Sequence, residues 1–173
     1  RNMVKRLYNT TEDRIIFIDN LSVGTHPDTW LRVDKSAVNE NITHYGERLI
    51  FIEDDFRNTL RILINDFAAF EKSLKVSIGT FADVFHFAAI VGGRAMIDGD
   101  PMMVALDLSI DAEFFYWVTR HKPDRVLYPS SSAAYPVSKQ TESNTIQLTE
   151  SDIDFNNMGQ PDMTYGWTKL TGE

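Results

Sequence analysis

Four short apolar runs, separated by longer segments with a helical pattern, are the feature that most constrains the fold of this chain. Each run is continuous and rich in β-branched and aromatic residues, as in strands that are covered on both faces. The segments between them repeat apolar residues three and four apart, for example from Leu60 to Phe70. Strands that alternate with helices in this way build a parallel α/β sheet. The runs are RIIFID (14–19), RLIFIE (48–53), DVFHFAAI (83–90) and RVLYPSSS (125–132).

Length and composition narrow the function classes. The 173 residues, 43% hydrophobic and 24% charged, suffice for one domain over 1–173 with a sizeable core. A net charge of −8 argues against a nucleic-acid or anionic-membrane partner, and no apolar run approaches the roughly 20 residues of a membrane span. The absence of cysteine excludes disulfides and thiolate metal sites and fits a cytoplasmic location. Because the four histidines show no ligand spacing, we expect no metal.

Polar and small residues follow the four runs, at the edge where parallel α/β sheets bind ligands. Asp19 ends the first run, where a carboxylate accepts hydrogen bonds from both hydroxyls of a ribose. Asp55 and Phe56 follow the second run, small residues follow the third, and three serines follow the fourth. The polar stretch 138–157 is expected to be a surface loop whose length suggests a function.

Tyr165 and Lys169 stand four residues apart near the end of the sequence. On a helix, positions i and i+4 lie on the same face, so the phenol and the ammonium share one small volume. A free tyrosine has a pKa of about 10, and a fixed cation nearby favours the phenolate. The spacing therefore suits a tyrosine that acts as a base near neutral pH, although an isolated pair of this kind is more often an ordinary surface feature.

Taken together, these segments resemble the extended short-chain dehydrogenase/reductases, in the branch of NAD-dependent nucleotide-sugar epimerases and dehydratases. The resemblance implies a Rossmann-like, doubly wound parallel sheet that binds NAD, which the acidic Asp19 favours over NADP. The segments that carry it, in family order, are IIFIDNLSVG, FIEDDFRN, DVFHFAAIVGG, RVLYPSSSAAYP and PDMTYGWTKLTGE.

The resemblance also implies roles for individual residues. Tyr165 would be the catalytic base, with Lys169 as its partner and as a contact of the nicotinamide ribose. Ser131 would hold the sugar hydroxyl, with Ser132 beside it. Asp107 stands where the family usually has asparagine, which leaves its role as a contact in doubt. The implied cofactor contacts are Asp19, Asn20, Ser22, Asp55, Phe56, Phe87, Ala88, Ala89, Val91 and Lys169.

The implied reaction is 4-epimerisation of a UDP- or GDP-sugar through a keto-sugar intermediate. Dehydratases of the family carry an Asp-Glu pair directly after the active-site serine or threonine, where this chain has Ser132 and Ala133. A keto-sugar reductase or a dehydratase of the same family remains an alternative. A non-catalytic member that senses a nucleotide or serves as a scaffold is an alternative of another class.

Two parts of the family pattern are missing. No first strand with a Gly-x-x-Gly-x-x-Gly turn precedes residue 14, and no substrate-binding region follows Lys169. We therefore expect an incomplete Rossmann domain from a longer enzyme, with an intact but rearranged sheet as the alternative. Members of the family often pair through two long helices, here expected around 101–121 and from 163 onward, so a homodimer is a weaker expectation. Among the remaining residues, His86, Met102 and Met103 are expected in packing.

Overall fold

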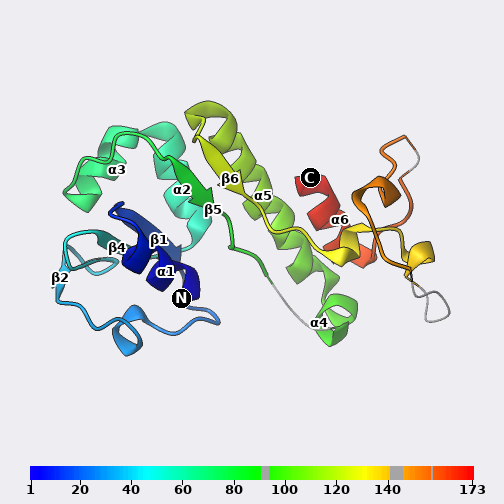
Figure 1. Ribbon diagram of the computed structural model, residues 1–173, viewed down its shortest axis with the longest axis horizontal. Helices are drawn as coiled ribbons and strands as arrows, with labels where there is room; N and C mark the ends of the chain where they lie inside the picture. The colour runs from blue at the N-terminus through cyan, green and yellow to red at the C-terminus, as the bar shows by residue number, and fades with distance from the viewer. Residues whose placement is uncertain (91–93, 141–145, 157) are drawn as a thin grey trace. The chain divides into compact units, whose positions relative to one another are not determined.

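The computed structural model describes residues 1–90, 94–140, 146–156 and 158–173. These residues form two compact units, Arg1–Thr80 and Phe81–Glu173 (Figure 1).

The first unit contains a four-stranded sheet in the order β1-β4-β3-β2. β1 and β4 pair in parallel, with Ile15 opposite Leu49 and Asp19 opposite Glu53, so both strands end at the same edge. β3 and β2 continue the sheet as an antiparallel hairpin. The elements of this unit are α1 (Asn2–Thr10), β1 (Ile15–Asp19), η1 (Pro27–Thr29), β2 (Lys35–Ala37), β3 (Ile42–Tyr45), β4 (Leu49–Glu53), α2 (Phe56–Asn65) and α3 (Phe67–Leu74).

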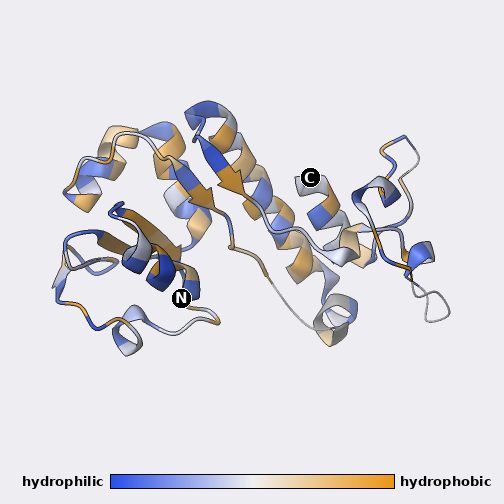
Figure 2. Cartoon of the chain, viewed as in Figure 1, coloured by the Kyte–Doolittle hydropathy of each residue, from blue (hydrophilic) through white to orange (hydrophobic). Residues whose placement is uncertain are grey.

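β4 is buried on both faces, as its unbroken apolar sequence indicates. Successive side chains of a strand point to opposite sides, so Leu49 and Phe51 face one core and Ile50 and Ile52 the other. Leu49 and Phe51 pack with Ile15 and with apolar side chains of α1. Figure 2 shows the hydrophobic character of β1 and β4. β4 is therefore covered on both faces, as an interior strand of a doubly wound sheet requires.

The second unit contains the parallel pair β5 and β6, in register from Asp83 opposite Arg125 to Phe85 opposite Leu127. The long helix α5 begins after Asp100, whose side chain accepts a hydrogen bond of 3.2 Å from the Met103 amide, and it packs against α6. The elements are β5 (Asp83–Phe85), α4 (Arg94–Gly99), α5 (Pro101–His121), β6 (Arg125–Leu127), η2 (Ser132–Ala134), η3 (Val137–Lys139), η4 (Glu150–Asp152) and α6 (Met163–Gly172).

The four apolar runs all form strands, in two parallel pairs, and the two long helices begin and end close to where the sequence places them. Three details differ from expectation. The hairpin of β2 and β3 was not predicted, because β2 is short, polar and fully exposed. The helical segment after β4 divides at Asp66, which ends α2 and caps α3 by accepting a hydrogen bond from the Ala69 amide.

The third difference concerns packing. Met102 and Met103, expected in packing, are 75% and 42% exposed in the first turn of α5, whose buried residue is Val104. His86 is buried, as expected, and its Nε2 lies 2.7 Å from Oδ1 of Asp111.

Candidate active site

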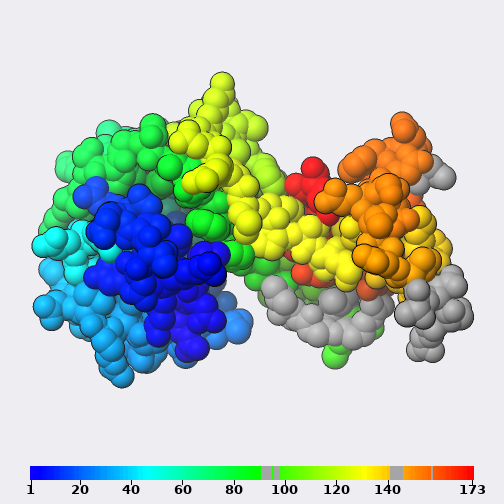
Figure 3. All heavy atoms as spheres, in the orientation of Figure 1, coloured from blue at the N-terminus to red at the C-terminus, as the bar shows by residue number. Residues whose placement is uncertain are grey.

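The tyrosine and lysine singled out by their spacing lie on α6. Tyr165 is half-buried and Lys169 is buried, and Nζ of Lys169 lies 5.9 Å from the centroid of the Tyr165 ring. The helix thus places the cation and the phenol on the same side, as the i, i+4 geometry requires. Figure 3 shows atoms of α6, in red, at the surface.

Ser131 begins the short helical turn η2 that follows β6. Its Oγ accepts a hydrogen bond of 3.2 Å from the Ala133 amide, which caps the turn. A serine hydroxyl that accepts from an amide keeps its own hydrogen for donation to another group. Ser131 is half-buried, whereas Ser132, the next residue, is exposed.

The turn formed by Ser131 and η2, called the serine turn below, packs directly against α6. The Asp162 amide, at the start of α6, donates to the Ala133 carbonyl at 2.9 Å. Gly166 lies on the same contact: a Cβ atom at this position would stand 2.3 Å from the Ala133 oxygen and 2.9 Å from Cβ of Pro161. Only glycine permits this approach, so Gly166 fixes the serine turn close to the helix that carries the tyrosine and the lysine.

Asp107 of α5 is buried close to these groups. Its Oδ1 accepts a hydrogen bond of 2.5 Å from the Ile90 amide, while its Oδ2 is buried without a hydrogen-bond partner among the described residues. Burial raises the pKa of the Asp107 carboxyl above its ordinary value, and the Ile90 amide and the Lys169 ammonium act in the opposite direction. Asp107 therefore fixes the segment after β5 and lies within the electrostatic influence of Lys169.

In the first unit, Asp19 lies exposed at the end of β1. Its Oδ1 accepts a hydrogen bond of 2.8 Å from the Leu21 amide, and Oδ1 of Asn20 accepts one of 3.1 Å from the Ser22 amide. The loop then returns toward the carboxylate, since a Cβ atom on Gly24 would stand 3.0 Å from Oδ2 of Asp19. Asp19 thus presents Oδ2 at the rim of a tight loop.

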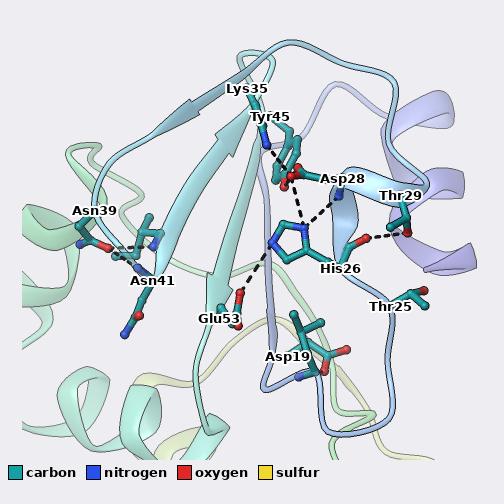
Figure 4. Close-up of polar contacts among 12 residues, drawn as sticks. Asp19, Thr25, His26, Asp28, Thr29, Lys35, Asn39, Asn41, Tyr45 and Glu53 are labelled. Carbon is teal, nitrogen blue, oxygen red and sulfur yellow. Dashed lines mark hydrogen bonds and ion pairs between the residues drawn. The ribbon is translucent and has the colours of Figure 1, made fainter.

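Around His26 and Asp28, the loop after Asp19 is held in place by a cluster of polar contacts (Figure 4). Asp28 accepts hydrogen bonds from the Tyr45 hydroxyl at 2.6 Å and from the Lys35 ammonium. These bonds lower the pKa of the Asp28 carboxyl. His26 lies 3.7 Å from the carboxylate of Glu53, the last residue of β4. The cluster therefore connects the loop to the strand ends.

Asp55 and Phe56 lie where α2 begins. The Asp55 side chain accepts from the Arg57 amide at 2.9 Å and from the Arg57 guanidinium at 3.0 and 2.6 Å. The Arg57 contacts hold the pKa of the Asp55 carboxyl below its ordinary value. The structure therefore gives this carboxylate a helix-capping role, and Phe56 is the first helical residue, half-buried.

The expected wall along the cofactor follows β5 in the second unit. Phe87 is 54% exposed and stacks on Phe85, and Ala88 and Ala89 are partly buried. Val91 lies outside the described residues.

In the described part of the chain, no three histidine or carboxylate side chains gather in a way that could hold a metal ion. Of the helices described, none has the length and apolar character to span a bilayer.

Comparison of this chain with known proteins shows a similarity in fold to solved structures. No protein-family model matches the sequence, and none of the curated proteins matches it significantly. Among solved structures, a UDP-N-acetylglucosamine 4-epimerase from Methanobrevibacter ruminantium, in complex with UDP-N-acetylmuramic acid, is similar over 99% of this chain and 43% of its own, with 22% identity and a TM-score of 0.63. An epimerase from Methanothermobacter thermautotrophicus shows 19% identity and a TM-score of 0.62, over 99% of this chain and 41% of its own.

A UDP-glucose 4-epimerase from Thermus thermophilus, in complex with NAD, is similar over 99% of this chain and 44% of its own, with 13% identity and a TM-score of 0.61. This chain has the fold of these epimerases. It spans about two fifths of the length of each of the three. The Rossmann-like fold expected from the sequence is confirmed, and the resemblance to nucleotide-sugar epimerases holds at the level of the fold.

Sequence reasoning missed three residues that shape this site within the epimerase fold. A signal existed for Gly166, because a glycine inside a helix is unfavourable and calls for a packing reason. Asp111 and Tyr128 form a hydrogen bond of 2.7 Å between α5 and the segment after β6. They are 17 residues apart in sequence, and nothing in their local pattern predicts that contact.

Proposed function

We propose that the protein is an NAD-dependent nucleotide-sugar 4-epimerase of the extended short-chain dehydrogenase/reductase family. The observation that carries the proposal is the direct attachment of the serine turn to α6. The hydrogen bond from Asp162 to Ala133 and the close approach at Gly166 hold Ser131 beside the helix that carries Tyr165 and Lys169.

The three side chains supply complementary chemistry. Tyr165, as a phenolate, takes the proton of a sugar hydroxyl, while Ser131 donates a hydrogen bond to the same oxygen. The buried ammonium of Lys169 stabilises the phenolate by charge. A bound NAD would supply the hydride acceptor and donor that this chemistry needs. Tyr165 would return its proton to the same oxygen after the keto-sugar has turned over, so that the ring carbon is left with the opposite configuration.

Residues on this chain suit an adenine dinucleotide. Asp19 presents a carboxylate oxygen toward the space that Gly24 leaves open, where it would accept hydrogen bonds from ribose hydroxyls and repel a 2′-phosphate. Asn20 and Ser22 lie in the same loop, and Phe56 marks the next strand end. The remaining contacts proposed from the resemblance are Asp55, Phe87, Ala88, Ala89 and Val91.

UDP-sugars are the first substrates to test, with GDP-sugars next. The solved structures with this fold include enzymes named as UDP-glucose and UDP-N-acetylglucosamine 4-epimerases. The dehydratase reaction is disfavoured, because Ser132 and Ala133 supply no carboxylate beside Ser131.

The test is an assay of the full-length protein with NAD and a panel of UDP- and GDP-sugars, with the 4-epimer measured by chromatography. Loss of one hydrogen-bond donor at the reacting oxygen should lower kcat about 10²- to 10³-fold in Ser131→Ala. Ser130→Ala is the matched control, because the adjacent Ser130 is exposed and contacts Glu173 instead. Reduction of keto-sugars without epimerisation would favour the reductase, and no turnover with any sugar would overturn the proposal.

A further inference from the structure

Three hydrogen-bonded side chains, two of them buried and one half-buried, lie next to Lys169 and are not used by the proposed reaction. The Tyr128 hydroxyl donates to Oδ2 of Asp111 at 2.7 Å, and Oδ1 of Asp111 lies 2.7 Å from Nε2 of His86. His86 and Asp111 are 3% and 4% exposed. Burial and the Asp111 carboxylate raise the pKa of Tyr128 well above its ordinary value, so this phenol stays protonated and keeps donating.

The other side of the Tyr128 ring meets α6. Nζ of Lys169 lies 4.9 Å from the centroid of the Tyr128 ring, nearer than the 5.9 Å to the Tyr165 ring. A Cβ atom on Gly172 would stand 2.3 Å from the Tyr128 hydroxyl oxygen and 2.6 Å from Cε1. The ring therefore fits between Asp111 and α6 because residue 172 has no side chain.

We propose that Tyr128 is a positioning residue that holds the Lys169 ammonium beside Tyr165 through a cation–π contact, with its ring fixed by the Asp111–His86 pair. The inference rests on the proposed function for its catalytic consequence. A lysine carries four rotatable bonds, and an aromatic face within about 6 Å attracts its ammonium strongly when both are desolvated. Asp111 restrains the ring from α5, so the position of Nζ depends on an element other than its own helix.

Nuclear magnetic resonance of the full-length protein with ¹³C-labelled lysine tests the placement without activity. Ring currents from Tyr128 should shift the ε-CH₂ signal of Lys169 upfield, and Lys169→Gln assigns that signal. Tyr128→Leu should move it toward the position of an exposed lysine, while the control Tyr116→Leu, on the exposed side of α5, should leave it unchanged. If Tyr128→Leu leaves the chemical shift of the Lys169 ε-CH₂ group unchanged, the inference is overturned.

Kinetics separate positioning from folding. Tyr128→Leu should lower kcat about tenfold with KM unchanged, as loss of one desolvated cation–π contact implies. Tyr128→Phe, which keeps the ring but loses its hydrogen bond to Asp111, should recover part of that loss. A loss in Tyr128→Phe as large as that in Tyr128→Leu overturns the cation–π role.

A Tyr128→Leu variant that does not fold, and a wild-type protein without epimerase activity, each require a further measurement. If Tyr128→Leu does not fold, Gly172→Ala serves in its place, because the new methyl group must displace the Tyr128 ring and move the Lys169 signal; an unmoved signal overturns the inference. If the wild-type protein epimerises no sugar, the proposed function fails, and the resonance of Lys169 still decides whether Tyr128 holds it.

Discussion

Replacement of Gly166 by alanine tests the contact on which the proposed active site depends. The new Cβ atom would stand 2.3 Å from the carbonyl oxygen and 3.1 Å from the carbonyl carbon of Ala133, both backbone atoms of the serine turn. Neither atom belongs to a flexible side chain that can rotate away. The turn and α6 must therefore separate, which also stretches the hydrogen bond from the Asp162 amide to Ala133.

The size of the effect follows from three contributions. Overpacking costs about 1–3 kcal/mol, and the weakened hydrogen bond costs about 1 kcal/mol. Alanine in a helix recovers about 1 kcal/mol relative to glycine. The expected net change is a loss of about 1–3 kcal/mol in the free energy of unfolding. A displacement of Ser131 by about 1 Å from Tyr165 should also lower kcat by about 10²-fold.

Denaturant unfolding and the epimerase assay on the full-length protein measure both effects. Gly99→Ala is the matched control: it changes a helical glycine whose new Cβ would meet no described atom from outside its own helix within 4 Å, so stability should stay equal or rise slightly. If Gly166→Ala is as stable and as active as Gly99→Ala, the serine turn does not rest on α6 and the reasoning fails.

Three further predictions concern stability. Burial raises the pKa of the Asp107 carboxyl, so the ionised carboxylate lowers the stability of the fold as the pH rises above 3.8. Asp107→Asn should therefore be more stable than the wild type at neutral pH, and this gain, measured by urea unfolding, should shrink as the pH falls toward 3.8. Lys35 and Tyr45 lower the pKa of the Asp28 carboxyl, so the ionised carboxylate stabilises the fold above pH 3.8, and this stabilisation is lost as the pH falls below 3.8. Asp28→Asn should therefore reduce the dependence of the free energy of unfolding on pH in the acid range. Arg48 donates to three backbone carbonyls beside α1, and Arg48→Met should lower the unfolding midpoint by an amount equivalent to about 1–3 kcal/mol.

The sequence predicts the parts of the fold that depend on local patterns. Continuous apolar runs identify β1 and β4, since strands buried on both faces need apolar side chains at every position. The i, i+4 spacing places Tyr165 and Lys169 on one face of a helix, as the structure has them. These features require only the geometry of single elements.

Features that depend on contacts between distant segments escape sequence reasoning. The exposed strand Lys35–Ala37 has no apolar alternation, and its pairing comes from β3. The bonds that join His86, Asp111 and Tyr128 connect α5 to the segments after β5 and β6, and buried polar pairs leave no local pattern. The carboxylate of Asp55 likewise binds Arg57, a contact that the resemblance to the family does not indicate.

The most direct test is a comparison of wild-type and Tyr165→Phe full-length protein with NAD and a UDP-sugar deuterated at C4. A phenylalanine keeps the ring and removes the oxygen that we propose takes the proton. The wild-type protein should form the 4-epimer with deuterium retained at C4, and Tyr165→Phe should be slower by about 10²- to 10⁴-fold, while Tyr116→Phe should match the wild type. Epimerisation by Tyr165→Phe at the wild-type rate would contradict the assignment of Tyr165 as the base.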